Sequence, residues 1–257
     1  MADDVQAVLF DLDGVLYVGG QMIAGADVAV RAVRERGLAV AGLTNTTTQP
    51  RRAIAEKLAR FGIDIAAHEI FTPAALAQQV IGRRRARLLV REALLEDFQS
   101  VTRDANHPEV VVMGDLGDSG YAPSLLNEIF RQVMDGAELL ALHKNRFWQK
   151  SAQQGSALHL DLGPFVAAIE YATGQSAQLL GKPSRDCFHG VCQALQVSPA
   201  AAWMVGDDVE SDVGGAQAAG LRAALVQTGK YRAAFVRSTG IVPDLLLPSV
   251  AELSAAL

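Results

Sequence analysis

Two aspartates stand directly behind a short apolar run near the start of the chain. The run Ala7–Phe10 ends at Asp11, and Asp13 and Gly14 follow it. On an extended chain, side chains two residues apart point the same way, so the two carboxylates would lie close together. Their repulsion would raise a pKa unless a cation neutralised them, and hard oxygen ligands of this kind suit Mg²⁺. The pair therefore indicates chemistry that depends on a divalent cation.

A second acidic cluster follows a later apolar run. Residues 203–205 are apolar, and Asp207, Asp208, Glu210 and Asp212 come directly after Gly206. So many acids behind a buried strand would be costly without a cation. The alternative is a solvated acidic loop, and the cluster alone does not decide between the two.

Three other polar residues could contact an anion such as a phosphoryl group. Thr44 and Asn45 follow the apolar residues 38–43, and a hydroxyl and an amide can both bind phosphoryl oxygens, although Thr and Asn are also ordinary turn residues. Lys182 precedes a predicted helix and could neutralise a phosphoryl oxygen. A lone Lys is, however, more often a solvated surface charge.

The elements that would position these residues alternate along the chain. Continuous apolar runs suit parallel strands that are covered on both faces, and apolar residues at helical spacing lie between them. This alternation predicts an α/β fold with a doubly wound, Rossmann-like parallel sheet, whose ligand site lies beyond the carboxyl ends of the strands. We therefore expect Asp11, Thr44 and Asp207 to converge there. The expected strands are 7–10, 38–43, 203–205 and 223–226, and the expected helices are 26–36, 50–61, 183–195 and 214–219.

The middle of the chain has the pattern of a second α/β unit, inserted into the first. We expect this cap domain at residues 78–180, with the core domain formed by residues 1–77 and 181–257. Ser124 is a candidate N-cap for one of its helices. Its expected strands are 87–90, 109–113 and 138–142, and its expected helices are 124–134 and 164–173.

Composition limits the class of protein. The chain has 257 residues, half of them apolar, and a net charge of −5, which argues against a nucleic-acid binder because such a protein needs a basic face. Cys187 and Cys192 match no Cys-x-x-Cys pattern, and we expect buried thiols in a reducing compartment. The sequence has no signal-type apolar run at its start and no segment that could span a bilayer. We therefore expect a soluble, cytoplasmic protein with no membrane and no nucleic-acid partner.

The order of these residues is more specific than any one of them. Asp-x-Asp-Gly at 11–14, Thr44, Lys182 and Gly-Asp-Asp-x-x-x-Asp at 206–212 resemble the four motifs of the haloacid dehalogenase-like (HAD) hydrolase superfamily. The stretches 11–17, 43–47 and 206–217 look like subclass IIA, which carries a large α/β cap between the second and third motifs. Residues 143–148, 165–174 and 226–231 also fit that subclass. The similarity covers nearly the whole chain.

This resemblance implies a Mg²⁺-dependent phosphatase that acts on a small phosphorylated molecule and forms a homodimer through the cap. Asp11 would be the nucleophile that forms an aspartyl-phosphate, and Asp13 the general acid and base. Asp11, Asp207 and the main-chain carbonyl of Asp13 would hold Mg²⁺, while Asp208 and Asp212 would orient metal-bound water. The phosphoryl group would be bound by Asp11, Asp13, Thr44, Asn45 and Lys182.

Two rival functions keep the same core. A phosphomutase or phosphotransferase would return the phosphoryl group to a bound molecule, and a non-catalytic phosphate-binding regulatory module would not turn over at all. The large α/β cap argues against a mutase, because the family's mutases have a mainly helical cap. The complete set of motif residues argues against a non-catalytic module. Pyrophosphate, phosphoamino acids with P–N bonds and small phosphomonoesters all remain candidate substrates.

Overall fold

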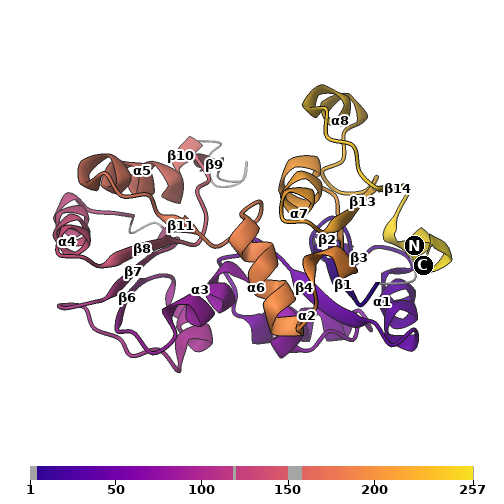
Figure 1. Ribbon diagram of the computed structural model, residues 1–257, viewed down its shortest axis with the longest axis horizontal. Coiled ribbons are helices and arrows are strands. Elements are labelled where there is room, and N and C mark those ends of the chain that lie inside the picture. Colours follow the sequence, from indigo (N-terminus) through magenta and orange to yellow (C-terminus); the bar gives the residue numbers. More distant parts are fainter. Residues whose placement is uncertain (1–4, 118–119, 150–157, 257) are drawn as a thin grey trace. The chain divides into compact units, whose positions relative to one another are not determined.

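The computed structural model describes residues 5–117, 120–149 and 158–256, and the chain divides into two compact units (Figure 1). The first, here called the core unit, comprises Met1–Asn45, Arg51–Thr72 and Lys182–Leu257. The second, the cap unit, comprises Thr46–Pro50 and Pro73–Gly181. Each unit has its own parallel sheet and its own hydrophobic core, so the predicted α/β class is confirmed.

The core unit is built on a six-stranded sheet in the order β14-β13-β12-β1-β4-β5, in which every neighbouring pair is parallel. Phe10 is in register with Val205 on one side and with Gly42 on the other. The residues that follow these three strands therefore lie at one edge of the sheet. The strands are β1 (Ala7–Phe10), β4 (Ala39–Leu43), β5 (Ile70–Phe71), β12 (Ala202–Gly206), β13 (Arg222–Val226) and β14 (Leu245–Leu247).

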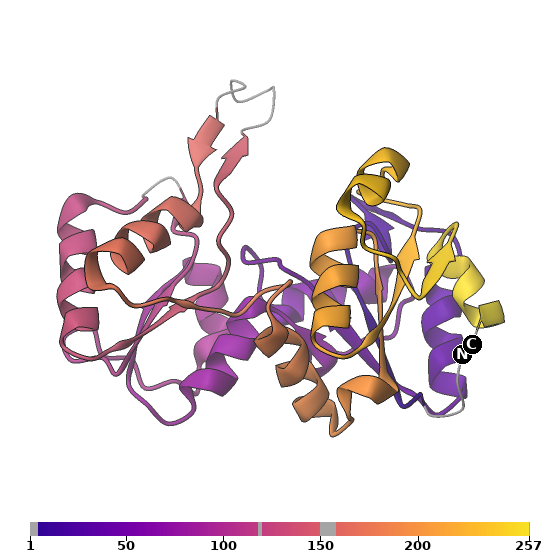
Figure 2. The same ribbon diagram turned by 45° about the horizontal axis from the view of Figure 1, so that its top comes forward.

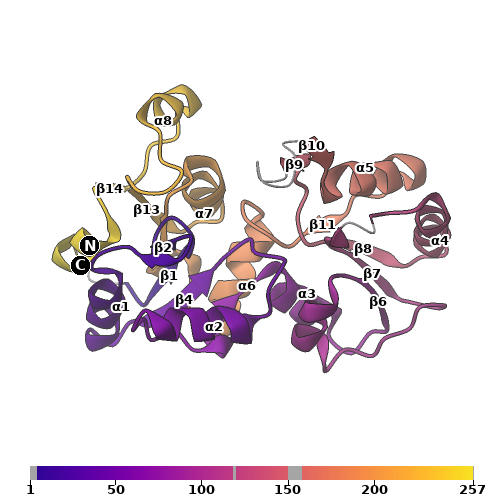
Figure 3. The ribbon, with the colours of Figure 1, turned by 180° about the vertical axis from the view of Figure 1, so that it is seen from behind.

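Helices cover both faces of this sheet, as a doubly wound fold requires. Helices α6 and α7 lie in front of the sheet in Figure 1, and α1 and α2 lie in front of it when the molecule is seen from behind in Figure 3. The helices are α1 (Ala26–Glu35), α2 (Arg51–Arg60), α6 (Arg185–Leu195), α7 (Gly215–Ala218), α8 (Ala233–Thr239) and α9 (Leu253–Ala256). Helix α1 has Arg36 as its C-cap, and Gly37 follows with a φ of +73°, the left-handed conformation that commonly ends a helix.

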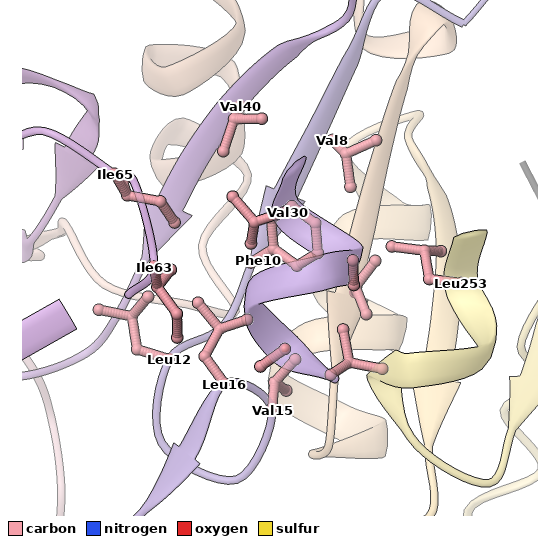
Figure 4. Close-up of a cluster of buried hydrophobic side chains, with 14 of the residues drawn as sticks. Val8, Phe10, Leu12, Val15, Leu16, Val30, Val40, Ile63, Ile65 and Leu253 are labelled. Carbon is pink, nitrogen blue, oxygen red and sulfur yellow. The ribbon is translucent and has the colours of Figure 1, made fainter. Parts of the chain in front are cut away.

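The hydrophobic core of this unit packs α1 and α9 against β1 and β4 (Figure 4), and Ile54 and Leu58 of α2 belong to the same cluster. Phe10 is fully buried, and all four residues of β1 are buried, as expected for a strand covered on both faces. The chain behind the strand contributes Leu12, Val15 and Leu16 to the same cluster. Apolar packing thus anchors the backbone on both sides of Asp11 and Asp13.

The cap unit has a four-stranded parallel sheet in the order β11-β8-β7-β6, with α4 and α5 packed on one face of β7 and β8. Strands β9 and β10 form a separate antiparallel pair that extends away from this sheet (Figure 2). The strands are β6 (Ala86–Leu89), β7 (Val110–Met113), β8 (Glu138–Ala141), β9 (Phe147–Gln149), β10 (Leu158–Leu160) and β11 (Gln178–Leu179). The helices are α3 (Pro73–Ile81), α4 (Pro123–Met134) and α5 (Leu162–Thr173).

Two details differ from the expectations drawn from the sequence. The N-cap of α4 is Ala122, not Ser124, because Pro123 occupies the first turn, where a missing N–H costs nothing. The expected cap boundary at residue 78 lies inside α3, a helix of the cap unit that begins at Pro73.

Other features concern single elements. A short hairpin of β2 (Tyr17–Val18) and β3 (Gln21–Met22) follows the first aspartates. Cys187 and Cys192 are buried and unpaired, as expected. Within the described ranges, no helix combines the length and the apolar character that crossing a membrane requires.

Candidate active site

Three aspartates meet at the carboxyl edge of the core sheet. Asp11 extends β1, and its N–H donates to the carbonyl of Val205 on β12 at 2.9 Å. One carboxylate oxygen from each of Asp11, Asp207 and Asp212 lies within 4.8 Å of the others. The three side chains are buried, with exposures of 7%, 1% and 1% for their residues. The two acidic clusters seen in the sequence therefore form one site.

Lys182 supplies the positive charge of this site. Its Nζ donates a hydrogen bond to Oδ1 of Asp11 at 2.7 Å. The same Nζ forms an ion pair with Oδ1 of Asp212 at 2.7 Å, without hydrogen-bond geometry. The residue is 6% exposed, so the solvated surface charge considered from the sequence is excluded. A buried ion pair of this kind is stable only where the geometry is good, and removing one partner would leave the others uncompensated.

Burial and mutual repulsion shape the charge of the site. Burial raises the pKa of Asp11 above its ordinary value, although the Lys182 ammonium opposes the rise. Burial likewise raises the pKa of Asp212 to about 6, against the pull of Lys182 and with a contribution from Asp11. Burial alone would lower the pKa of Lys182, but the two carboxylates raise it, so the ammonium stays charged. The ionised site carries more negative than positive charge.

Asp207 is held in a tight cradle of backbone. Its Oδ2 accepts a hydrogen bond from the N–H of Lys230 at 2.7 Å. A Cβ added to Gly14 or Gly229 would lie 1.9 or 2.0 Å from that oxygen, so both positions need glycine, and both have positive φ. The other oxygen, Oδ1, is buried and has no hydrogen-bond partner among the described residues. An unpartnered buried carboxylate oxygen is expected where a cation binds.

Asp212 is fixed by the turn that carries it. Its Oδ2 accepts hydrogen bonds from the N–H groups of Asp207 and Asp208, both at 3.1 Å. Gly206 allows this approach, because a Cβ there would lie 2.2 Å from the Cβ of Asp212. Asp212 lies within the π-helical turn Val209–Gly214, a type of structure often found at functional sites.

Asp208 caps this turn. Its Oδ1 accepts from the N–H groups of Glu210 and Ser211, and its Oδ2 pairs with Nζ of Lys230 at 3.3 Å. Burial alone would raise the pKa of Asp208, but these N–H groups and Lys230 lower it. Asp208 is thus fully engaged in holding the turn and the loop around Lys230.

The remaining predicted residues lie around this centre. Thr44 follows β4 and is buried, and its N–H donates to the carbonyl of Phe71 at 3.1 Å. The exposed Asn45 forms hydrogen bonds with the main chain of Lys182. The side chain of Asp13 is exposed and is not one of the three clustered carboxylates, so a contact with a metal would use its main-chain carbonyl.

One part of the site was given no role from the sequence. The loop Thr228–Gly229–Lys230 follows β13, and its Lys230 N–H binds Asp207 while Oγ1 of Thr228 donates to the carbonyl of Gly14 at 2.5 Å. The apolar run 223–226 ended at this loop, so the rule that selected Asp11 and Asp207 at strand ends also pointed to it.

The donor set fits Mg²⁺. Asp11 and Asp207 offer hard carboxylate oxygens close together at the carboxyl edge of the sheet, and Oδ1 of Asp207 is buried without a hydrogen-bond partner. The site also has an excess of negative charge, which a bound cation would neutralise. Both carboxylate oxygens of Asp212 already contact protein groups: Oδ2 accepts hydrogen bonds from main-chain N–H groups, and Oδ1 pairs with the Lys182 ammonium. Asp212 is therefore better suited to orienting the site than to binding a metal directly.

Comparison with known proteins identifies the family. The sequence matches the haloacid dehalogenase-like hydrolase family over residues 8–107 and the related HAD-hydrolase-like family over residues 179–253. Human haloacid dehalogenase-like hydrolase domain-containing protein 2 is 38% identical over 231 residues, covering 89% of this chain and 86% of that protein. The chain belongs to the haloacid dehalogenase-like hydrolase family. It is therefore an enzyme, a hydrolase of the HAD phosphatase type, as the sequence motifs predicted.

Two further proteins are similar to this chain over nearly its whole length. Rat phospholysine phosphohistidine inorganic pyrophosphate phosphatase is 37% identical over 254 residues, which cover 94% of this chain and 92% of that protein. The structure of p-nitrophenyl phosphatase from Archaeoglobus fulgidus superposes with a TM-score of 0.86 at 22% identity and covers 99% of this chain and 100% of that one. The shared fold thus includes both units.

Proposed function

We propose that this HAD hydrolase is a Mg²⁺-dependent phosphatase that transfers a phosphoryl group from a small phosphorylated substrate to Asp11 and then hydrolyses the aspartyl-phosphate. The observation that supports this most directly is the buried contact between Asp11 and Lys182 beside two further aspartates. A carboxylate nucleophile divides one difficult displacement into two easier ones.

Asp11 and Asp207, with the main-chain carbonyl of Asp13, would hold Mg²⁺. When bound, the ion would supply positive charge that offsets both the clustered carboxylates and the phosphoryl oxygens. The Lys182 ammonium, held on Asp11, adds a fixed positive charge beside the nucleophile. The Thr44 hydroxyl at the end of β4 would bind a phosphoryl oxygen.

The proton transfers fall to Asp13. An oxygen of Asp11 would attack phosphorus while the bond to the leaving group breaks, and Asp13 would protonate the leaving atom. The Asp13 carboxylate would then take a proton from the water that attacks the phosphorus of the aspartyl-phosphate, which releases phosphate and restores Asp11. The exposed side chain of Asp13, two residues beyond the nucleophile, suits exchange with a substrate and with water.

The candidate substrates are suggested by the relatives and not by the geometry of the site. A relative at 37% identity is named for phospholysine, phosphohistidine and inorganic pyrophosphate. We therefore propose P–N phosphoamino acids, pyrophosphate and small phosphomonoesters as the panel from which the substrate should be identified.

The test compares the wild type with Asp11→Asn, using p-nitrophenyl phosphate, Mg²⁺ and a chelator. We expect phosphate release that requires Mg²⁺ and that falls by roughly 10³-fold or more in the variant, as for the loss of a covalent nucleophile. Intact-protein mass spectrometry of quenched wild type should detect a phosphorylated form that Asp11→Asn lacks. The matched control is Asp64→Asn, because the Asp64 side chain is 90% exposed. Equal background rates in wild type and Asp11→Asn would reject the proposal.

A further inference from the structure

The side-chain amide of Asn45 bonds to both main-chain polar groups of Lys182. The N–H of Lys182 donates to Oδ1 of Asn45 at 2.8 Å, and Nδ2 of Asn45 donates to the carbonyl of Lys182 at 2.9 Å. The two residues are 137 positions apart in the sequence. Such a two-bond bridge fixes both the position and the orientation of the peptide groups it joins.

The main chain of Lys182 has little other support. Lys182 lies between β11 and α6, and no main-chain group of the described residues hydrogen-bonds to its N–H or its carbonyl. Asn45 is the last residue of the first segment of the core unit, and Lys182 is the first residue of its last segment. The bridge therefore joins the ends of two segments of the core unit that are far apart in the sequence.

Lys182 needs this support because its side chain is long and flexible, while its ammonium must contact two carboxylates at once. Four rotatable bonds separate the backbone from Nζ, which lies 2.7 Å from both Asp11 and Asp212. A shift of the backbone would move the ammonium away from the nucleophile, and misplacement of about 1 Å can cost 10²-fold in rate.

We propose that the side chain of Asn45 is a positioning group that acts through Lys182, and not the ligand of the phosphoryl group that its place after Thr44 first indicated. Oδ1 of Asn45 is an acceptor, which would repel phosphoryl oxygens, and it is engaged by the N–H of Lys182. The amide holds the Lys182 backbone, and the backbone holds the ammonium on Asp11. The kinetic consequence of this inference rests on the proposed phosphatase function.

The first test is a double-mutant cycle of Asn45→Ala and Lys182→Met, with p-nitrophenyl phosphate and Mg²⁺. We expect Asn45→Ala to lower kcat by roughly 10- to 100-fold with little change in KM, because the ammonium is misplaced. In the Lys182→Met background the same change should have almost no further effect, because a positioning residue has nothing left to position. An equal loss in both backgrounds, or a rise in KM alone, would identify Asn45 as a direct ligand and overturn the proposal.

The second test needs no turnover. In protein labelled with ¹⁵N-lysine, the Lys182 ammonium signal, assigned by its loss in Lys182→Met, should shift or broaden in Asn45→Ala. The control is Gln217→Ala, which removes a comparable hydrogen bond from a side-chain amide to the carbonyl of Val242 and should leave the signal unchanged. An unchanged signal in Asn45→Ala would overturn the inference. If the wild type proved inactive, the phosphatase proposal would fail while this measurement still decided the role of Asn45.

Discussion

The individual residues of the site are arranged around an imbalance of charge. Three buried carboxylates face one buried ammonium, so the ionised site has a net negative charge in a poorly solvated place. Buried charges are tolerated only when they are paired, hydrogen-bonded or bound to a metal. Neither Oδ1 of Asp212 nor Oδ1 of Asp207 accepts a hydrogen bond from the described residues, but Oδ1 of Asp212 lies 2.7 Å from the Lys182 ammonium. The imbalance is therefore localised where a cation would correct it.

A single methyl group should be enough to disturb this arrangement. Gly229 has φ +57°, and a Cβ there would lie 2.0 Å from Oδ2 of Asp207. We expect Gly229→Ala to weaken Mg²⁺ binding severely and to destabilise the protein by about 2 kcal/mol or more through strain and steric conflict. Isothermal titration with Mg²⁺ and thermal unfolding measure the two effects.

The matched control is Gly19→Ala. Gly19 has φ +60° but no atom within 4 Å of an added Cβ, so this variant carries the same backbone strain without the conflict at Asp207. Its Mg²⁺ affinity should equal that of the wild type. If both variants bound Mg²⁺ as tightly as the wild type, the cradle around Asp207 would have no part in metal binding.

The sequence predicted the charged centre of the site better than its supports. Asp11 and Asp207 were accessible because each follows a continuous apolar run, and strand ends meet at one edge of a parallel sheet. The bridge from Asn45 to Lys182 was not accessible, because it joins positions 137 residues apart and depends on the exact path of two loops. The position of Lys182 before a predicted helix did not distinguish it from a solvated surface charge, and only its place in the order of the family motifs favoured a role in the site.

At the scale of elements, the length of a strand decided whether it could be predicted from the sequence. Strands β1 and β4 are apolar runs that stand out from their surroundings, and the helices after them carry apolar residues at helical spacing. Strand β5 has only the two residues Ile70 and Phe71, too few to show any periodicity. Such short strands form because the neighbouring strand supplies their hydrogen bonds, which is tertiary information.

We expect His143 to make the stability of the cap unit depend on pH. It follows β8, and its side chain is 8% exposed, with Nε2 3.8 Å from Oδ1 of Asp161, the N-cap of α5. Its Nδ1 accepts a hydrogen bond from the N–H of Asn145 at 3.3 Å, which requires that nitrogen to be unprotonated. Burial lowers the pKa of His143, while Asp161 and Asp115 oppose the shift.

The sign of the effect follows from this lowered pKa. The unfolded chain takes up the proton more readily, so the stabilising contribution is fully present above the ordinary pKa of about 6.5 and is lost as pH falls through the lowered value. We expect the cap to unfold at lower temperature at about pH 5 than at about pH 7.5, and His143→Asn to show a smaller difference. The exposed His107 provides the control variant, His107→Asn. An equally large difference in His143→Asn would exclude this histidine as the cause.

The whole molecule consists of two units with separate hydrophobic cores. The buried cluster of the core unit packs its helices against β1 and β4, and that of the cap unit packs α4 and α5 against β7 and β8. Every residue of the charged site, including Lys182 after the long insertion, belongs to the core unit. The inserted cap unit thus separates the site residues in the sequence, although they lie together in the core unit.

This division predicts where metal binding will stabilise the protein. A ligand that binds only the folded state adds about 2.7 kcal/mol at a concentration of 100 times its Kd, and the gain applies to the unit that must unfold to release it. Hydrogen exchange measured by mass spectrometry should therefore slow on addition of Mg²⁺ in peptides from residues 7–43 and 182–226, because these segments carry Asp11, Lys182 and Asp207. Peptides from residues 86–141, which include strands β6, β7 and β8 of the cap sheet, should exchange at an unchanged rate. Asp207→Asn should abolish the slowing in the core unit, and equal slowing in both units of the wild type would show that metal binding is not confined to the core unit.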